Sequence, residues 1–160
     1  AADITRTFPA SGQFSTKQQA IYEAVLDTQL SAINLCKPNT SFSSIQQHAV
    51  NQITQHLIDL KILQCSFNEA IETKQYLPYF PHRIGHTMGL DVHDIPLEDD
   101  ILQPGMVITI EPGIYVSQPG VYQGIGVRIE DNILITATGN ENLTTDAVKD
   151  IQAIEQLTQT

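Results

Sequence analysis

Two stretches in the second half of the chain limit the possible fold most strongly, because each places one carboxylate among residues typical of β-strands. They are Val107–Val116 and Gly124–Thr136, both rich in β-branched side chains. Such residues favour strands, and a short loop between two strands favours antiparallel pairing. We therefore expect two neighbouring antiparallel strands, connected by residues 117–123, that carry Glu111 and Glu130.

Side chains alternate between the two faces of a strand, so sequence position predicts the face on which each carboxylate lies. Glu130 shares a face with Arg128 and lies opposite Ile129, while Glu111 lies opposite Ile110. Two simpler interpretations stay open at this point. Glu130 forms an ordinary ion pair with Arg128 within a sheet, or Glu111 lies at a strand end near solvent.

The first half of the chain has helical periodicity. Apolar residues recur at turn spacing from Thr16 to Cys36, and again from Ile45 to Leu60 after a possible capping box of Ser43 with Gln46. A shorter helix is expected from residue 66, and the chain ends in a helical tail. Helices followed by strands indicate an α+β fold with amphipathic helices on one face of a mostly antiparallel sheet.

Length and charge restrict the class of protein. A chain of 160 residues fits a single domain, and a formal net charge of -10 with only eight Lys and Arg residues argues against binding to nucleic acid or to an anionic membrane. No apolar run approaches the ~18 residues of a transmembrane helix. Cys36 and Cys65 are expected to be ordinary buried or half-buried thiols in a reducing compartment, which favours a cytoplasmic location.

The carboxylates indicate a metal site. A carboxylate within an apolar strand is costly to bury unless a cation compensates its charge. Asp3, in ADITRTFP, and His86, in PHRIGHTMGLDVHD, lie on further strand-like segments and add one oxygen and one nitrogen ligand. Oxygen-rich ligation with one imidazole suits Mn²⁺, Fe²⁺, Co²⁺ or Zn²⁺, and two such ions about 3.5–4 Å apart catalyse hydrolysis. Asp3 also has a simpler interpretation as a solvated residue near a chain end.

Three histidines lie close together in the sequence and need separate interpretation. His82 and His86 are four residues apart, but Pro81 and Gly85 favour an irregular or extended segment over a zinc-binding helix. There, one imidazole can bind a metal while His82 or His93 donates a hydrogen bond to substrate. His48 and His56, on the polar side of the second helix, are expected at the surface.

The motifs together are specific enough to indicate a family. The chain resembles the catalytic domain of aminopeptidase P and prolidase, the proline-directed pita-bread metallopeptidases, in the segments PHRIGHTMGLDVHD, LQPGMVITIEPGIYV and GIGVRIEDNILITATGNENLT. ADITRTFP and the following FSTKQQAIYEAVL resemble an earlier strand and helix of the same family, so the likeness runs from about Asp3 to Thr145. It implies an incomplete pita-bread fold and one catalytic metallopeptidase domain over residues 1–160.

The resemblance also implies roles for individual residues. Asp3 and Glu130 would bridge two divalent metal ions, and His86 and Glu111 would each bind one of them. Glu111 would also transfer a proton. His82 and His93 would stabilise the tetrahedral intermediate or bind substrate, and Arg128 would orient the nearby carboxylates. Mn²⁺ is the favoured metal, with Co²⁺, Zn²⁺ or Fe²⁺ as alternatives.

The implied activity is that of an Xaa-Pro aminopeptidase acting on peptides with proline in second position, with a homo-oligomer expected for the complete protein. The alternatives are a prolidase that cleaves Xaa-Pro dipeptides and an inactive pita-bread binding module. In the family a further Asp on a preceding strand and an N-terminal domain complete the site, so we expect this chain alone to be inactive. Arg83 departs from the family pattern, which has Gly after the first histidine, and is expected to point to solvent.

Overall fold

The computed structural model describes residues 1–97 and 99–158 and contains four helices and six strands within them. The helices are α1 (Thr16–Leu35), α2 (Phe42–Asp59), α3 (Phe67–Glu72) and α4 (Ile151–Leu157). The strands are β1 (Thr87–Met88), β2 (Val107–Ile110), β3 (Gly113–Tyr115), β4 (Gly126–Arg128), β5 (Asp131–Ile135) and β6 (Asn140–Asn142). No described helix is both long and apolar enough to span a membrane.

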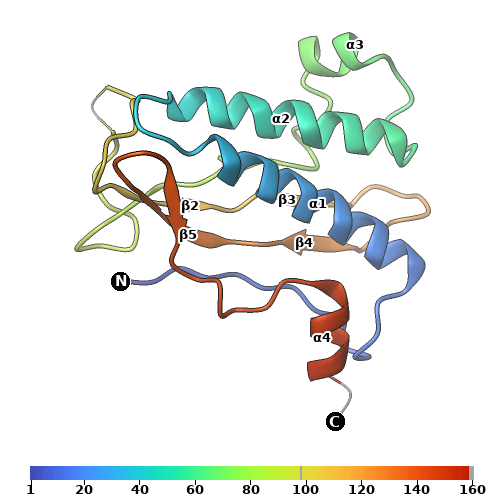
Figure 1. Ribbon diagram of the computed structural model, residues 1–160. Coiled ribbons are helices and arrows are strands. Elements are labelled where there is room, and N and C mark those ends of the chain that lie inside the picture. The colour runs from blue at the N-terminus through green and yellow to red at the C-terminus, as the bar shows by residue number, and fades with distance from the viewer. Residues whose placement is uncertain (98, 159–160) are drawn as a thin grey trace.

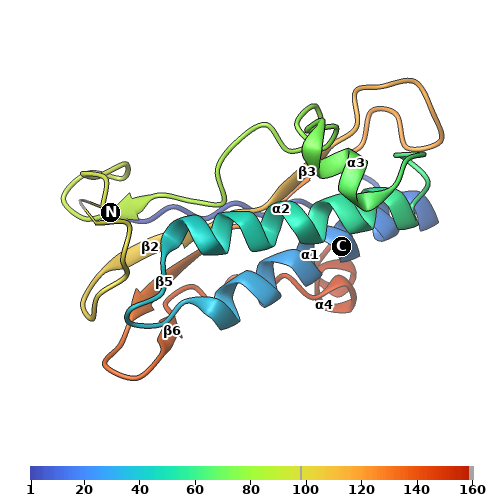
Figure 2. The same cartoon turned by 90° about the horizontal axis from the view of Figure 1, so that it is seen from above.

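Helices α1 and α2 run side by side along the strands, as Figures 1 and 2 show. A complete capping box of Ser15 with Gln18 begins α1. The expected box of Ser43 with Gln46 at α2 is wrong, because Ser41 is the N-cap. Ser43 is the second residue of the helix, and its backbone N–H and hydroxyl donate to the carboxylate of Asp100.

The strands form two antiparallel sheets, one with the order β1-β2-β5-β6 and one of β3 paired with β4. The expected long strands are therefore each divided in two. Pro112 lies in the gap between β2 and β3, where its missing N–H prevents a continuous ladder. The matching gap between β4 and β5 holds Ile129 and Glu130.

The N-terminal segment, expected as a strand, is extended but has no strand assigned to it. It runs beside β4 and β5 in Figure 1, where the backbone N–H of Glu130 donates to the carbonyl of Thr5 at 3.0 Å. The side chain of Asn132 accepts a hydrogen bond from the N–H of Asp3 and donates to its carbonyl. The segment is thus extended without being a regular strand, and it is held largely by side chains.

The core lies between the two long helices and the sheets. Its fully buried members include Ile21 and Val25 of α1, Ile53 of α2, Ile108 of β2 and Ile133 of β5. Cys36 is buried and Cys65 is half-buried, both as free thiols, as expected. His48 and His56 are half-buried rather than fully exposed, since His48 contacts Ser31 and His56 pairs with Asp27 across the contact between α1 and α2.

Candidate metal centre

The two glutamates predicted from the strands lie at the two gaps between the sheets. Glu111 follows the last residue of β2, and Glu130 precedes the first residue of β5. The pairing register continues across the gaps and places Glu111 opposite Glu130, so both side chains point to the same side of the strands. One ligand atom each from His86, Glu111 and Glu130 lie within 4.8 Å of one another.

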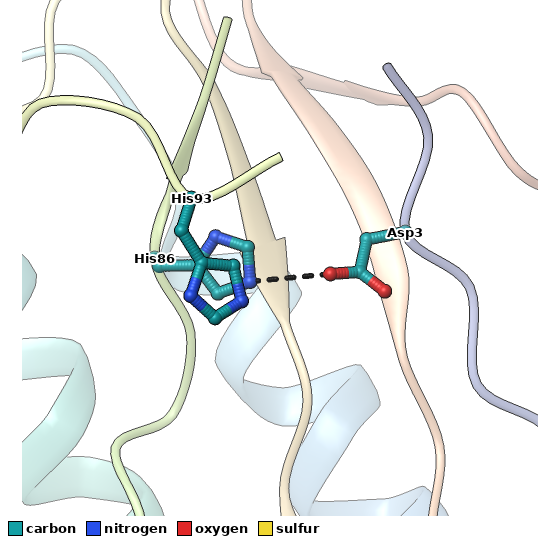
Figure 3. A group of neighbouring side chains, drawn as sticks. All are labelled: Asp3, His86 and His93. Atoms are coloured by element: carbon teal, nitrogen blue, oxygen red, sulfur yellow. Dashed lines mark ion pairs between the residues drawn. The ribbon is translucent and has the colours of Figure 1, made fainter. Parts of the chain in front are cut away.

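His86 is the centre of the group. Its Nε2 lies 3.4 Å from Oδ2 of Asp3 and 3.6 Å from Oε1 of Glu111. Figure 3 shows the His86 ring directed toward the Asp3 carboxylate, which comes from the N-terminal segment, and the His93 ring lies beside it at an interplanar angle of 44°. Four segments that are distant in the sequence thus bring Asp3, His86, Glu111 and Glu130 together.

The hydrogen bond on the other side of the His86 ring determines what its Nε2 can do. Nδ1 lies 3.1 Å from the carbonyl oxygen of Thr87, and a carbonyl only accepts, so Nδ1 carries a proton. In the neutral ring, Nε2 then presents a lone pair to the oxygens of Asp3 and Glu111. Nε2 and these oxygens would then all be acceptors, which repel one another unless a cation lies between them. A metal-binding histidine has this arrangement.

The loop that carries His86 is fixed against β2. The backbone N–H of His86 donates to the hydroxyl of Thr109 at 3.0 Å, and that hydroxyl is 3.4 Å from Oε1 of Glu111. A Cβ at Gly85 would lie 1.9 Å from the carbonyl oxygen of Thr109. Only glycine therefore permits this approach, which brings His86 within reach of the carboxylates.

Burial makes the carboxylates of this centre hard to ionise without a cation. Glu130 is only 2% exposed and its carboxylate accepts a hydrogen bond from Thr5 at 2.5 Å. Burial raises the pKa of Glu130, and burial likewise raises the pKa of Glu111. Arg128 is the nearest fixed cation, with its Nε 3.9 Å from Oε2 of Glu111 and 3.2 Å from the hydroxyl of Thr5.

The other two histidines differ in exposure. His93 is exposed, and its ring centroid lies 4.0 Å from that of His86; Asp3, His86 and His93 together form a second possible ligand group. His82 is half-buried, and burial lowers its pKa, so the ring is neutral near pH 7. Its Nδ1 donates to the carbonyl of Arg83, which leaves Nε2 to accept from the hydroxyl of Tyr115 at 2.8 Å.

Sequence reasoning missed Tyr115. Its ring needs the space left by two glycines: a Cβ at Gly113 would lie 2.5 Å from the Tyr115 hydroxyl, and Gly126 is its partner across the β3–β4 pair. A tyrosine in a strand normally suggests core packing, so only the two glycines on the same face could have indicated this position. Arg83 is exposed, as expected, with its guanidinium carbon 5.9 Å from the ring centroid of Phe42.

The donor set fits a divalent metal. Three carboxylates and the imidazole of His86 converge, and in the described part of the chain the guanidinium of Arg128 lies 3.9 Å from one of these carboxylates. One guanidinium leaves an excess of negative charge at a partly buried site. Oxygen donors with one imidazole are the ligands preferred by Mn²⁺, Fe²⁺, Co²⁺ and Zn²⁺ in proteins.

Comparisons with known proteins agree with this chemistry. The model of metallopeptidase family M24 matches residues 1–137. The Xaa-Pro aminopeptidase of Haemophilus influenzae is 47% identical over 98% of this chain and 38% of its own length, and that of Escherichia coli is 43% identical over 98% and 37%.

The fold expectation is confirmed in the same way. A zinc-substituted aminopeptidase P of Escherichia coli, solved in complex with product, superposes with a TM-score of 0.93 at 43% identity, over 99% of this chain and 38% of that one. The chain thus spans well under half the length of these relatives. Because the family model covers most of the sequence, and relatives are similar over nearly all of it, the chain belongs to metallopeptidase family M24.

Proposed function

We propose that the full-length protein is a metal-dependent Xaa-Pro aminopeptidase that removes the N-terminal residue from peptides with proline in second position. The observation that carries the proposal is the position of His86, whose Nε2 faces both Asp3 at 3.4 Å and Glu111 at 3.6 Å. The names of the relatives support the reaction, and the donor set supports two divalent ions. Mn²⁺ is the metal we favour.

The family resemblance implies the proposed roles, and the proximity of the four side chains supports them. Asp3 and Glu130 would bridge the two ions, while His86 and Glu111 would each bind one. Bound divalent ions supply Lewis acidity, which favours ionisation of water and polarises a substrate carbonyl. The Glu111 carboxylate would accept the proton of the attacking water and deliver it to the leaving nitrogen.

The surrounding groups would position the substrate. His93 is exposed beside His86, so its ring is open to a peptide carbonyl. Both nitrogens of His82 are engaged, and we propose that His82 acts by orienting the Tyr115 hydroxyl. Arg128, close to Glu111 and to the Thr5 hydroxyl, would orient the carboxylates and offset part of their charge.

We also propose that residues 1–160 are one part of a larger catalytic unit and are inactive alone, since the resemblance implies one further Asp ligand. The two free thiols favour a cytoplasmic location. The homo-oligomer implied by the resemblance is a separate expectation, which sedimentation of the full-length protein would check.

Peptide hydrolysis by the full-length protein tests the activity. After chelation and addition of Mn²⁺, Ala-Pro-Ala should release free alanine faster than the dipeptide Ala-Pro, and the chelated protein should release none. A strong preference for Ala-Pro would instead identify a prolidase. Binding of Mn²⁺ without cleavage of either peptide would identify a binding module and refute the proposed activity.

A further inference from the structure

Directly behind the candidate metal centre, a second group of charges lies on the opposite side of the same strands. Its centre is Asp131, which is fully buried and forms ion pairs with Arg6 at 2.6 Å and with Lys149. The side chains of Arg6 and Lys149 are only 14% and 20% exposed. Burial opposes ionisation of Asp131, but hydrogen bonds from Lys149 and Arg6 outweigh it and lower its pKa.

Arg6 ties together the two backbones that carry Asp3 and Glu130. Its Nη1 donates to the carbonyl of Thr5 at 2.9 Å and to the carbonyl of Glu130 at 2.6 Å. One guanidinium therefore holds the N-terminal segment against the residue that precedes β5. Side chains alternate on both segments, so Thr5 and Glu130 meet in front while Arg6 and Asp131 meet behind.

Other contacts fix the guanidinium in this position. Nη2 donates to Asp131 and to the carbonyl of Ala147 at 2.7 Å, and Nε donates to the same carbonyl at 3.0 Å. Lys149 binds the second oxygen of Asp131 and also the amide oxygen of Gln29 of α1 at 2.7 Å. The planar fork of Arg6 is thus fully used, in a geometry that the single ammonium group of a lysine cannot reproduce.

We propose that Arg6 is a positioning residue for the metal centre, which sets the distance between Asp3 and Glu130 by holding their backbones together from behind. The inference rests on the proposed function, because it assigns a purpose to that spacing. It concerns the geometry of the guanidinium rather than its charge. The hydrogen bonds of Arg6 go to Asp131 and to backbone carbonyls, and we propose that it acts on the centre through the carbonyls of Thr5 and Glu130.

Two substitutions in the full-length protein separate geometry from charge. Arg6→Lys keeps the positive charge and removes the fork, while Arg6→Gln removes both. Arg83→Lys, at an exposed arginine, is the matched control. Each variant is compared in a Mn²⁺ titration by calorimetry and in amide hydrogen exchange of the metal-free protein, read in the peptide that covers residues 1–9. The second readout is independent of metal.

Both Arg6 variants should bind one of the two Mn²⁺ ions at least about tenfold more weakly, and residues 1–9 should exchange faster in both, while Arg83→Lys matches the wild type. Wild-type affinity and exchange in Arg6→Lys would overturn the proposal, as would a loss confined to Arg6→Gln. If the wild type binds no Mn²⁺, the proposed function fails, but the exchange rates still decide whether Arg6 holds the segment.

Lys149→Met provides a second test if the Arg6 variants do not fold. It removes one support of Asp131 and leaves every hydrogen bond of Arg6 in place. Because the fork of Arg6 keeps its hydrogen bonds, residues 1–9 should exchange as in the wild type. Faster exchange of residues 1–9 in this variant would contradict the proposal, because it would show that the charge of the Asp131 group, and not the geometry of Arg6, holds the segment.

Discussion

Glu130 and Asp131 are adjacent in the sequence and both are buried, but their pKa values are shifted in opposite directions. Glu130 faces the candidate metal centre beside Asp3 and Glu111, and burial raises its pKa. Asp131 faces the other side of the strands, where hydrogen bonds from two cations overcome burial and lower its pKa. The group behind the strands is electrostatically complete within the chain, whereas the group in front is not.

This difference explains why we assign metal binding to the side of the strands that carries Glu130 (the front) and a structural role to the side that carries Asp131 (the back). Natural proteins rarely leave buried charges without partners, so an acidic group that lacks sufficient cations indicates a missing one. Asp131 shows that this chain can supply cations to a buried carboxylate where it needs them. The predictions below change one side at a time.

Removal of the Glu111 charge should have the largest effect. Glu111→Gln keeps the shape of the side chain but can neither accept the proton nor bind a metal as an anion. We expect about a thousandfold loss of kcat on Ala-Pro-Ala, equivalent to about 4 kcal/mol, with no loss of metal-free stability. Glu141→Gln, at an exposed glutamate, serves as control, and peptidase activity retained in Glu111→Gln would contradict the assigned role.

The corresponding change behind the strands should affect stability first. Asp131→Asn leaves Arg6 and Lys149 without their shared anion, and loss of one partner of a buried pair is expected to cost about 3 kcal/mol. Urea denaturation of the metal-free protein measures this loss. Asp146→Asn, at an exposed position nearby, should change little. A loss in Asp131→Asn that is no greater than this control would show that the pairs contribute nothing.

The pH dependence of metal-free stability should differ between the two sides. Glu111 has a folded pKa above its ordinary value of 4.5, so its contribution favours the folded state at low pH and is lost as the pH rises through the raised pKa. As the pH falls from 7 toward 4.5, the metal-free wild type should therefore gain stability in urea denaturation relative to Glu111→Gln, by less than about 1.4 kcal/mol per pH unit.

The lowered pKa of Asp131 has the opposite sign. Its contribution is present above the ordinary value of 3.8 and is lost only as the pH falls through the lowered folded pKa. The stability difference between wild type and Asp131→Asn should thus stay constant from pH 7 to 5.5. A difference that shrinks over this range would mean that Asp131 is not held ionised by its partners.

The smallest expected effect is at Thr5, which links the two sides. Thr5→Val removes the hydroxyl that donates to Glu130 at 2.5 Å and accepts from Arg128, while the backbone contacts with Arg6 remain. We expect Mn²⁺ affinity to fall about fivefold, the equivalent of about 1 kcal/mol for one hydrogen bond. Thr145→Val, at an exposed threonine, is the control, and equal affinities in calorimetry would contradict the prediction.

The residues that face the candidate metal centre were predicted from the sequence better than the ion pairs on the opposite side of the strands. Alternation placed Arg128 and Glu130 on one face, and the two long helices and antiparallel strands were predicted nearly to their ends. The gaps between the sheets were missed, although Pro112 was a signal for one of them. The register nevertheless continues across the gaps, and it places Glu111 opposite Glu130 with both carboxylates on the same side.

Long-range pairing explains most of what could not be predicted. Arg6 and Asp131 are 125 positions apart, and nothing near either residue indicates its partner. The N-terminal segment was expected as a strand, but its ties to Asn132 and Glu130 are made by side chains and single backbone bonds. Such contacts depend on the completed fold and leave no local pattern.

The position of bound metal tests the central claim most directly. Crystals of the full-length protein grown with Mn²⁺ should show two anomalous difference peaks, enclosed by Asp3, His86, Glu111 and Glu130, at about 2.0–2.3 Å from their ligand atoms. Peaks at that place would confirm that metal completes the acidic side of the strands. A single peak, or manganese bound elsewhere while this group stays empty, would contradict the account.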